Sequence, residues 1–160
     1  MAKTHKTNAA RLLDRAKVAY ELVAYPVDPD NLAATHVAEV LGEPVEAVYK
    51  TLVLEGNRTG LFACVVPADK EINLKKAAAA SGNKSADMLP LRELLPATGY
   101  IRGGCTAIAM KKPMPVIIQQ ECLGQPVIYV SAGERGLQLK LSPTDYIAFT
   151  KATVADITTS

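Results

Sequence analysis

A chain of 160 residues with 49% hydrophobic and 21% charged residues has the composition of one soluble globular domain with a substantial core. No apolar stretch approaches the roughly 20 residues of a membrane span, and the polar, basic N-terminus is unlike a secretory signal, so we expect a cytoplasmic protein without membrane contact. A net charge of +2 is too small to predict tight nucleic-acid binding from electrostatics, although a weak or partner-assisted contact stays open. The absence of Trp and the two Phe argue against a base-stacking platform.

The first half of the chain predicts short helices alternating with strands. Thr7 or Asn8 can cap the first helix. Thr35 can cap the second, and Gly42 can end it. The turn signal at residues 56–58 predicts a hairpin between the strands on either side. The expected elements are helices over residues 9–17 and 36–41, a helical turn after Pro44, and strands over 21–25, 48–54 and 61–66.

The second half contains further capped helices and a strand-rich region. Asn73 can cap a helix that Gly82 ends. Pro90 can open a helix that stops before Pro96, and Ser142 can cap the last one. The expected elements are helices over residues 74–81, 91–95 and 146–150 and strands over 100–101, 116–118, 127–130, 137–141 and 153–157. The strand over 137–141 alternates apolar and polar residues, so we expect one of its faces to be wet.

The order of these elements predicts the fold class. Helices and strands are mixed without a regular βαβ rhythm, and no repeat, low-complexity tract or linker divides the chain. We therefore expect an α+β protein, with a single domain over residues 1–160. Its mixed, mostly antiparallel sheet should be barrel-like and flanked by short helices.

Lys50 is the most informative single residue, because it interrupts an otherwise apolar strand. Burying an ammonium group without a partner costs several kcal/mol. Lys50 therefore either reaches solvent from an edge strand or faces a pocket that uses its charge. Two glycine-containing loops, over residues 99–104 and 130–136, could supply the other walls of such a pocket.

The three cysteines indicate neither disulfides nor a metal. Cys64, Cys105 and Cys122 are odd in number and have no CxxC spacing. Cys105 follows a glycine pair in a candidate site loop, but a nucleophilic thiol needs a base, and His5 and His36 lie far upstream. We expect Cys64 to be a small buried hydrophobe and Cys105 not to be a nucleophile.

The chain lacks a GxSxG motif, a P-loop and a dinucleotide fingerprint. Its glycine loops are suited to presenting backbone N–H groups to an oxygen that gains charge, although tight turns use the same glycines. From the residues alone, the prediction is an α+β domain with a pocket for acyl chemistry.

Five segments together carry a resemblance to a known family. In order and spacing, residues 49–52, 65–69, 73–76, 98–104 and 128–136 resemble the YbaK-type Cys-tRNA(Pro) deacylases, relatives of the editing domains associated with prolyl-tRNA synthetase. The resemblance covers essentially the whole chain. It implies a barrel-like α+β fold, no metal, no dissociable cofactor, and a substrate in which cysteine is wrongly esterified to proline tRNA.

The same resemblance implies roles for individual residues. Lys50 matches the essential lysine of the family, placed to contact the aminoacyl group or the terminal ribose. Gly103 matches the glycine whose backbone lines the acyl group, and Ser131 matches the site serine. The remaining substrate-binding positions fall at Tyr20, Thr51, Gly104 and Gly133.

The family mechanism implied here uses the substrate's own thiol to attack the ester, giving a cyclic thioester and free tRNA. Catalysis would then depend on orientation and desolvation. Prolyl-tRNA synthetase is the expected recruiting partner. Two alternatives stay open: a deacylase of the same fold that uses water and prefers alanyl esters, and a non-catalytic module that binds a tRNA end or a partner.

Two departures from the family pattern stand out. Residues 105–109 lack the proline and second glycine that the family tends to carry after its glycine pair. Ala132 and Glu134 replace a glycine and a basic residue that are common in the second loop. The first departure bears on amino-acid preference, and the second removes a positive charge from the tRNA side.

Overall fold

We describe residues 5–159 of the chain in a computed structural model. The α-helices are α1 (Asn8–Arg15), α2 (Ala34–Leu41), α3 (Leu74–Ser81), α4 (Leu91–Thr98) and α5 (Pro143–Thr150). The strands are β1 (Glu21–Ala24), β2 (Tyr49–Gly56), β3 (Gly60–Pro67), β4 (Ala86–Met88), β5 (Val116–Gln119), β6 (Ile128–Ser131), β7 (Leu137–Leu141) and β8 (Thr153–Ala155). Two 3₁₀ turns, η1 (Val45–Ala47) and η2 (Gln120–Gly124), complete the fold.

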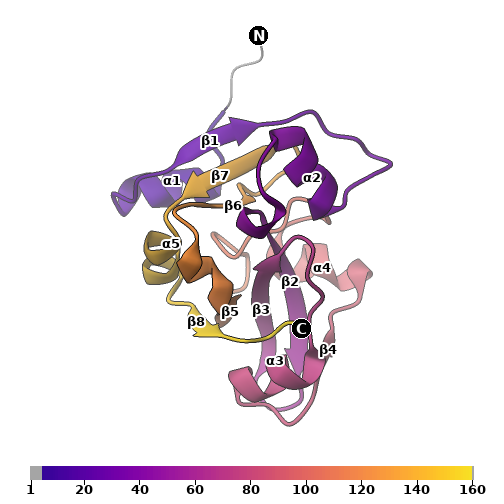
Figure 1. The fold of residues 1–160 in the computed structure, drawn as a ribbon. Helices are drawn as coiled ribbons and strands as arrows, with labels where there is room; N and C mark the ends of the chain where they lie inside the picture. The colour runs from indigo at the N-terminus through magenta and orange to yellow at the C-terminus, as the bar shows by residue number, and fades with distance from the viewer. Residues whose placement is uncertain (1–4, 160) are drawn as a thin grey trace.

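The strands form two sheets (Figure 1). The larger has the order β4-β2-β3-β5-β8; β2 pairs antiparallel with β3 and β4, whereas β3–β5 and β5–β8 are parallel. The smaller sheet, β1-β7-β6, is antiparallel. A parallel bridge between Val48 and Tyr129 links the two sheets. The α+β class with a mixed, mostly antiparallel sheet is confirmed, although the sheets meet without closing a barrel.

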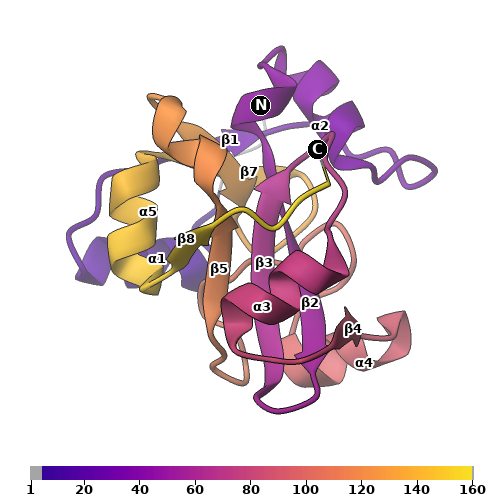
Figure 2. The same cartoon turned by 60° about the horizontal axis from the view of Figure 1, so that its bottom comes forward.

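The two faces of β3 contact different cores, because successive side chains of a strand point in opposite directions. Ala63 and Val65 belong to the main core, which also contains residues of α1, α5, β5, β6 and β7. Phe62 and Cys64 belong to a second core under α3, which crosses in front of β2 and β3 in Figure 2.

Local signals placed most helix ends correctly. Thr7 caps α1, Asn73 caps α3 and Ser142 caps α5, each accepting a backbone N–H in its side-chain oxygen. Gly42 and Gly82 end their helices in the left-handed conformation that favours glycine. The predicted hairpin between β2 and β3 is also confirmed.

Several boundaries differ from the predictions. Thr35 is not a cap: α2 begins at Ala34, and its N-cap Ala33 is extended without a side-chain hydrogen bond. Proline does not stop α4 at residue 95, because Pro96 removes only one hydrogen bond and the helix continues to the left-handed Gly99. β4 and η2 were not predicted.

No strand forms at residues 100–101. The Tyr100 hydroxyl instead donates to the carbonyl of Ile108 at 2.5 Å, which holds this segment as a loop against the main core.

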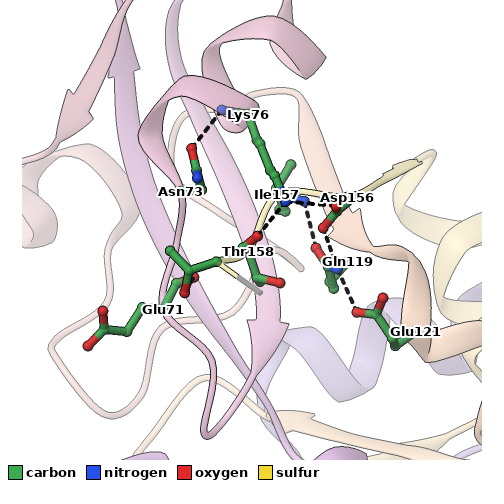
Figure 3. Close-up of polar contacts among 9 residues, drawn as sticks. Glu71, Asn73, Lys76, Gln119, Glu121, Asp156, Ile157 and Thr158 are labelled. Atoms are coloured by element: carbon green, nitrogen blue, oxygen red, sulfur yellow. Dashed lines mark hydrogen bonds and ion pairs between the residues drawn. The ribbon is translucent and has the colours of Figure 1, made fainter.

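The C-terminal segment is fixed by a buried glutamine (Figure 3). The Oε1 of Gln119 accepts the N–H of Ile157 at 2.6 Å, and its Nε2 donates to Asp156 at 2.9 Å. The ammonium of Lys76 donates to Asp156 at 2.8 Å and to the carbonyl of Thr158 at 2.9 Å. Because these side-chain contacts hold the chain after β8, the strand ends at Ala155 and not at residue 157.

Candidate functional site

The candidate site lies where one edge of β2 has no partner strand within residues 5–159. β4 pairs only with the end of β2, from Leu54 to Gly56, and its last contact is the Leu89 N–H donating to Val53. Pro90 then directs the chain into α4. At the other end of β2, the next neighbour is the single bridge to β6 at Val48. The edge of β2 between these two points is therefore open.

A cavity of about 540 Å³ fills this gap. Its volume lies within the range of small-molecule sites, roughly 300–1,000 Å³. Residues from both faces of β2 line the cavity, as expected for a cavity that lies beside the edge of the strand rather than over one face of the sheet. The lining consists of residues 48–53 together with 32–35, Val37, Ala68, Met88, Leu89, Leu91, Leu94, Arg102, Gly103, Cys105, Ser131 and Gln138.

Lys50 reaches the cavity from the α3 side of the larger sheet. It shares the strand face of Leu52 and Leu54, which pack in the core under α3. Its ammonium is partly buried and donates to the Ala68 carbonyl at 3.3 Å. Burial lowers the pKa of Lys50 below its ordinary value of 10.5, while the negative charges of Glu71 and Asp69 act in the opposite direction.

Ser131 and Gln138 approach the cavity from the smaller sheet. They are directly paired across β6 and β7 and are only 8% and 5% exposed. The Ser131 hydroxyl oxygen accepts the N–H of Gly133 at 3.1 Å. The Oε1 of Gln138 is buried and has no hydrogen-bond partner among the described residues.

The expectation of a wet face on the strand 137–141 is therefore wrong at Gln138. Alternation shows that Gln138 and its apolar neighbours face opposite ways, but it does not show what covers the polar face. Here a ligand-sized cavity lies beside it, and only Lys140 of this strand is partly exposed. The only sequence signal for Gln138 as a site residue was its position as the second residue of a strand that follows a glycine loop, which is weak by itself.

The two glycine loops pack against each other. Arg135 Nε donates to the Arg102 carbonyl at 2.8 Å. A Cβ on Gly104 would lie 3.0 Å from Cα of Glu134, and one on Gly133 would lie 3.1 Å from the ring of Tyr100. Both glycines permit close approach of the loops, and neither belongs to the cavity lining.

The other predicted site positions also divide into those that line the cavity and those that do not. Gly103 and Thr51 line the cavity. Tyr20 does not: its hydroxyl donates to Asp14 at 2.9 Å, near the junction of α1 and β1.

The loop over residues 105–109, the first departure from the family pattern, packs mostly inward. Thr106 and Ile108 are both buried, and Ile108 belongs to the main core. The loop thus obtains its shape by burying an apolar side chain.

The cysteines are buried and protonated at neutral pH. Burial raises the pKa of Cys105 and of Cys64 to about 12, and the pKa of Cys122 to about 11. Neither His5 nor His36 lines the cavity; they face Glu134 and Glu39 at 2.8 and 3.8 Å. Neither imidazole is therefore placed to generate a thiolate at Cys105.

Residues 5–159 contain neither a metal-binding cluster nor a membrane-spanning helix. No group of three or more His, Cys, Asp and Glu side chains is arranged to hold a metal ion. No helix in this part of the chain has the length and apolar character needed to cross a membrane.

The chain is similar to known proteins over nearly its full length. A model of the aminoacyl-tRNA editing domain family matches residues 28–149. A protein of Enterococcus faecalis named "Putative Cys-tRNA(Pro)/Cys-tRNA(Cys) deacylase EbsC" is 45% identical over 154 residues, covering 96% of this chain and 94% of that protein. A proline–tRNA ligase of Thermosipho africanus is 36% identical over 67 residues, which are 42% of this chain and 12% of the ligase.

The fold also has a counterpart among solved structures. A crystal structure described as "a putative trans-editing enzyme for prolyl tRNA synthetase" matches with a TM-score of 0.83 at 24% identity, covering 98% of this chain and 100% of that one. This second likeness concerns the fold.

Proposed function

This chain belongs to the aminoacyl-tRNA editing domain family and is an aminoacyl-tRNA deacylase, and we propose that its substrate is cysteine esterified to proline tRNA. The name of the relative from Enterococcus faecalis supports this substrate. The observation that carries the proposal is the cavity beside the open edge of β2, which combines Lys50 with a mainly apolar lining. Such a cavity is suited to orienting an acyl group and excluding water.

In the proposed reaction, the sulfur of the substrate cysteine attacks the ester carbonyl carbon. The new C–S bond closes a small cyclic thioester, the bond from the carbonyl carbon to the ribose oxygen breaks, and the thiol proton ends on that oxygen. The reaction therefore consumes no water and no other co-reactant. The absence of a thiolate and of an imidazole among the lining residues supports this route.

Lys50 serves in this proposal as a fixed positive charge. Electrostatic stabilisation is strongest where a preorganised charge faces developing negative charge in a water-poor site. The ammonium of Lys50 is held against the Ala68 carbonyl and lines the cavity, so it can face the ribose oxygen as that oxygen leaves. Gly103 and Ser131 line the acyl group on the other side.

A water-using reaction on alanyl esters is the second candidate. The specific observation that favours it is the unpartnered Oε1 of Gln138 beside the Ser131 hydroxyl, because this pair could hold a water molecule. The two candidates differ in what they require of the substrate side chain.

We further propose that prolyl-tRNA synthetase recruits the deacylase. The likeness to parts of two bacterial proline–tRNA ligases supports a functional connection with such enzymes. A net charge of +2 offers little attraction for tRNA phosphates, so a partner that already holds the tRNA would raise the local substrate concentration.

One deacylation panel tests these proposals. Proline tRNA charged with cysteine, serine or alanine is incubated with excess enzyme, and single-turnover rates are compared. Thiol attack requires the cysteine ester to react much faster than the serine ester, with the alanine ester nearly inert. Equal rates for cysteine and alanine esters would establish the water-using candidate. If none of the three esters were cleaved, only the non-catalytic binding module would remain.

A further inference from the structure

We infer that the backbone of Thr51 binds the aminoacyl group of the substrate, which pairs with it as a one-residue β-strand. This inference rests on the proposed function and assigns the group that recognises the substrate's own N–C–C(=O) unit. It follows from the hydrogen-bond register of β2 and from the gap beside that strand.

The register shows which backbone groups of β2 point away from β3. In an antiparallel pair, residues alternate between pairs that exchange hydrogen bonds and pairs that do not. Val53 is opposite Ala63, yet the Val53 carbonyl accepts from Leu89 and the Ala63 N–H donates to Pro115. This pair therefore directs its backbone groups outward, away from the β2–β3 interface.

The same alternation places Thr51, two residues earlier, in the outward class. Val48 provides an independent check on the opposite parity, because its carbonyl accepts from Ala68 on the continuation of β3. The N–H and the C=O of Thr51 consequently both face the edge that β4 does not reach.

No partner occupies that edge among the described residues. The register of β2 with β4 would bring residue 91 opposite Thr51, but Leu91 is already the first residue of α4. Neither the N–H nor the C=O of Thr51 has a hydrogen-bond partner on this edge among these residues, and Thr51 itself lines the cavity. An unpaired donor and acceptor in a partly buried site are suited to a ligand that supplies both complements.

An aminoacyl ester supplies them with the right spacing. Its carbonyl oxygen can accept the Thr51 N–H, and its α-ammonium can donate to the Thr51 carbonyl, as one residue of an added strand would do. When the carbonyl is attacked, the developing oxyanion stays within reach of the Thr51 N–H, which then stabilises it.

The pairing also determines where the substrate side chain lies. Opposed residues of an antiparallel pair project their side chains to the same face of the sheet. The substrate side chain would therefore share the face of Thr51, which is the face of Tyr49 and the main core, whereas Lys50 projects to the other face. Lys50 would then meet the ribose side of the ester.

Replacing single backbone amides by esters tests the inference. Introducing the α-hydroxy analogue of threonine at position 51 removes only the N–H of that residue. The matched control is the α-hydroxy analogue of glutamate at position 55, which lies outside the cavity lining; it also removes an N–H on the β4 side of β2 and also weakens a carbonyl that faces β3. We expect the ester at 51 to lower the single-turnover rate on Cys-tRNA(Pro) by about 100-fold and the control ester to change it less than about 3-fold, with both proteins folded at the assay temperature. Equal activity of the two esters would overturn the inference.

Amide hydrogen exchange provides a test on the unmodified protein. In the free protein, the Thr51 amide should exchange faster than the Leu52 amide, which faces β3. Saturation with 3′-cysteinylamino-3′-deoxyadenosine, whose amide link resists cleavage, should slow exchange at Thr51 by about tenfold or more, the loss expected on forming a protected hydrogen bond. Binding of this analogue without protection of Thr51 would refute the pairing, and so would an absence of binding. An unmodified enzyme that fails on all charged tRNAs would instead refute the proposed function.

Discussion

Ser131 and Gln138 face each other across β6 and β7 at the wall of the cavity, and the glutamine carbonyl oxygen has no hydrogen-bond partner there. A buried polar group without a partner lowers stability by about 1–3 kcal/mol. Such a group is expected where a ligand provides the missing donor.

Gln138→Leu should therefore separate stability from activity. Leucine fills a similar volume without a polar group, so we expect the free energy of unfolding in urea to rise by about 1 kcal/mol. Deacylation of Cys-tRNA(Pro) should slow by about tenfold, the equivalent of one lost hydrogen bond of about 1.4 kcal/mol. Unchanged kinetics in this variant would remove Gln138 from the site.

Lys50→Met should abolish deacylation while the protein stays folded. Because the folded protein lowers the pKa of Lys50, the unfolded chain binds more protons between that pKa and 10.5, and stability from this residue rises with pH in that window. Burial of the charged ammonium therefore lowers the stability of the folded protein at pH 7. The methionine variant should be more stable than wild type at pH 7, with the gain shrinking as the pH rises from the folded-state pKa of Lys50 to 10.5. The control is the exposed Lys70→Met, which should change neither property.

Gly104→Ala should disrupt the contact between the glycine loops. The added Cβ would lie 3.0 Å from Cα of Glu134, which is backbone and cannot rotate away. We expect a loss of about 1–3 kcal/mol in unfolding free energy and a matching fall in activity. Gly124→Ala is the control, since a Cβ there meets nothing within 4 Å. Equal melting temperatures for the two variants would contradict the packing role.

The cysteines of the protein should be dispensable for the reaction. Burial holds the pKa of Cys105 at about 12, so its thiol is not an available nucleophile at pH 7. Cys105→Ala should keep the single-turnover rate on Cys-tRNA(Pro) within about threefold of wild type once folding is confirmed by circular dichroism. A large loss of activity in the folded variant would point instead to a protein thiol.

Binding of tRNA by the isolated protein should be weak and only shallowly dependent on salt. The slope of log affinity against log salt is about −0.9 for each phosphate neutralised on a duplex. A protein with a net charge of +2, and with Glu134 on a site loop, can neutralise few phosphates of the tRNA. Addition of prolyl-tRNA synthetase should raise the apparent affinity in a fluorescence titration. A steep salt slope and tight selective binding by the protein alone would argue against recruitment.

The sequence alone determined the features that depend on neighbouring residues. The caps at Thr7 and Asn73, the hairpin after β2 and the end of α3 at Gly82 follow from local backbone preferences, which act in any surroundings. The position of Lys50 in an apolar strand also identified a candidate site residue, because an ammonium group that interrupts an apolar run must reach solvent, a partner or a pocket.

Tertiary structure decided the features that depend on whether distant segments of the chain contact each other. The cavity exists because β4 stops short and leaves the other edge of β2 at Thr51 without a partner strand, and strand pairing over such a sequence distance leaves no local pattern at residue 51. The same applies to Gln138, whose polar face looked solvent-exposed, and to Gly104, whose small size serves a contact with Glu134. A residue's chemistry can be read from its type, but whether it faces a cavity, another loop or water is determined by packing between distant parts of the chain.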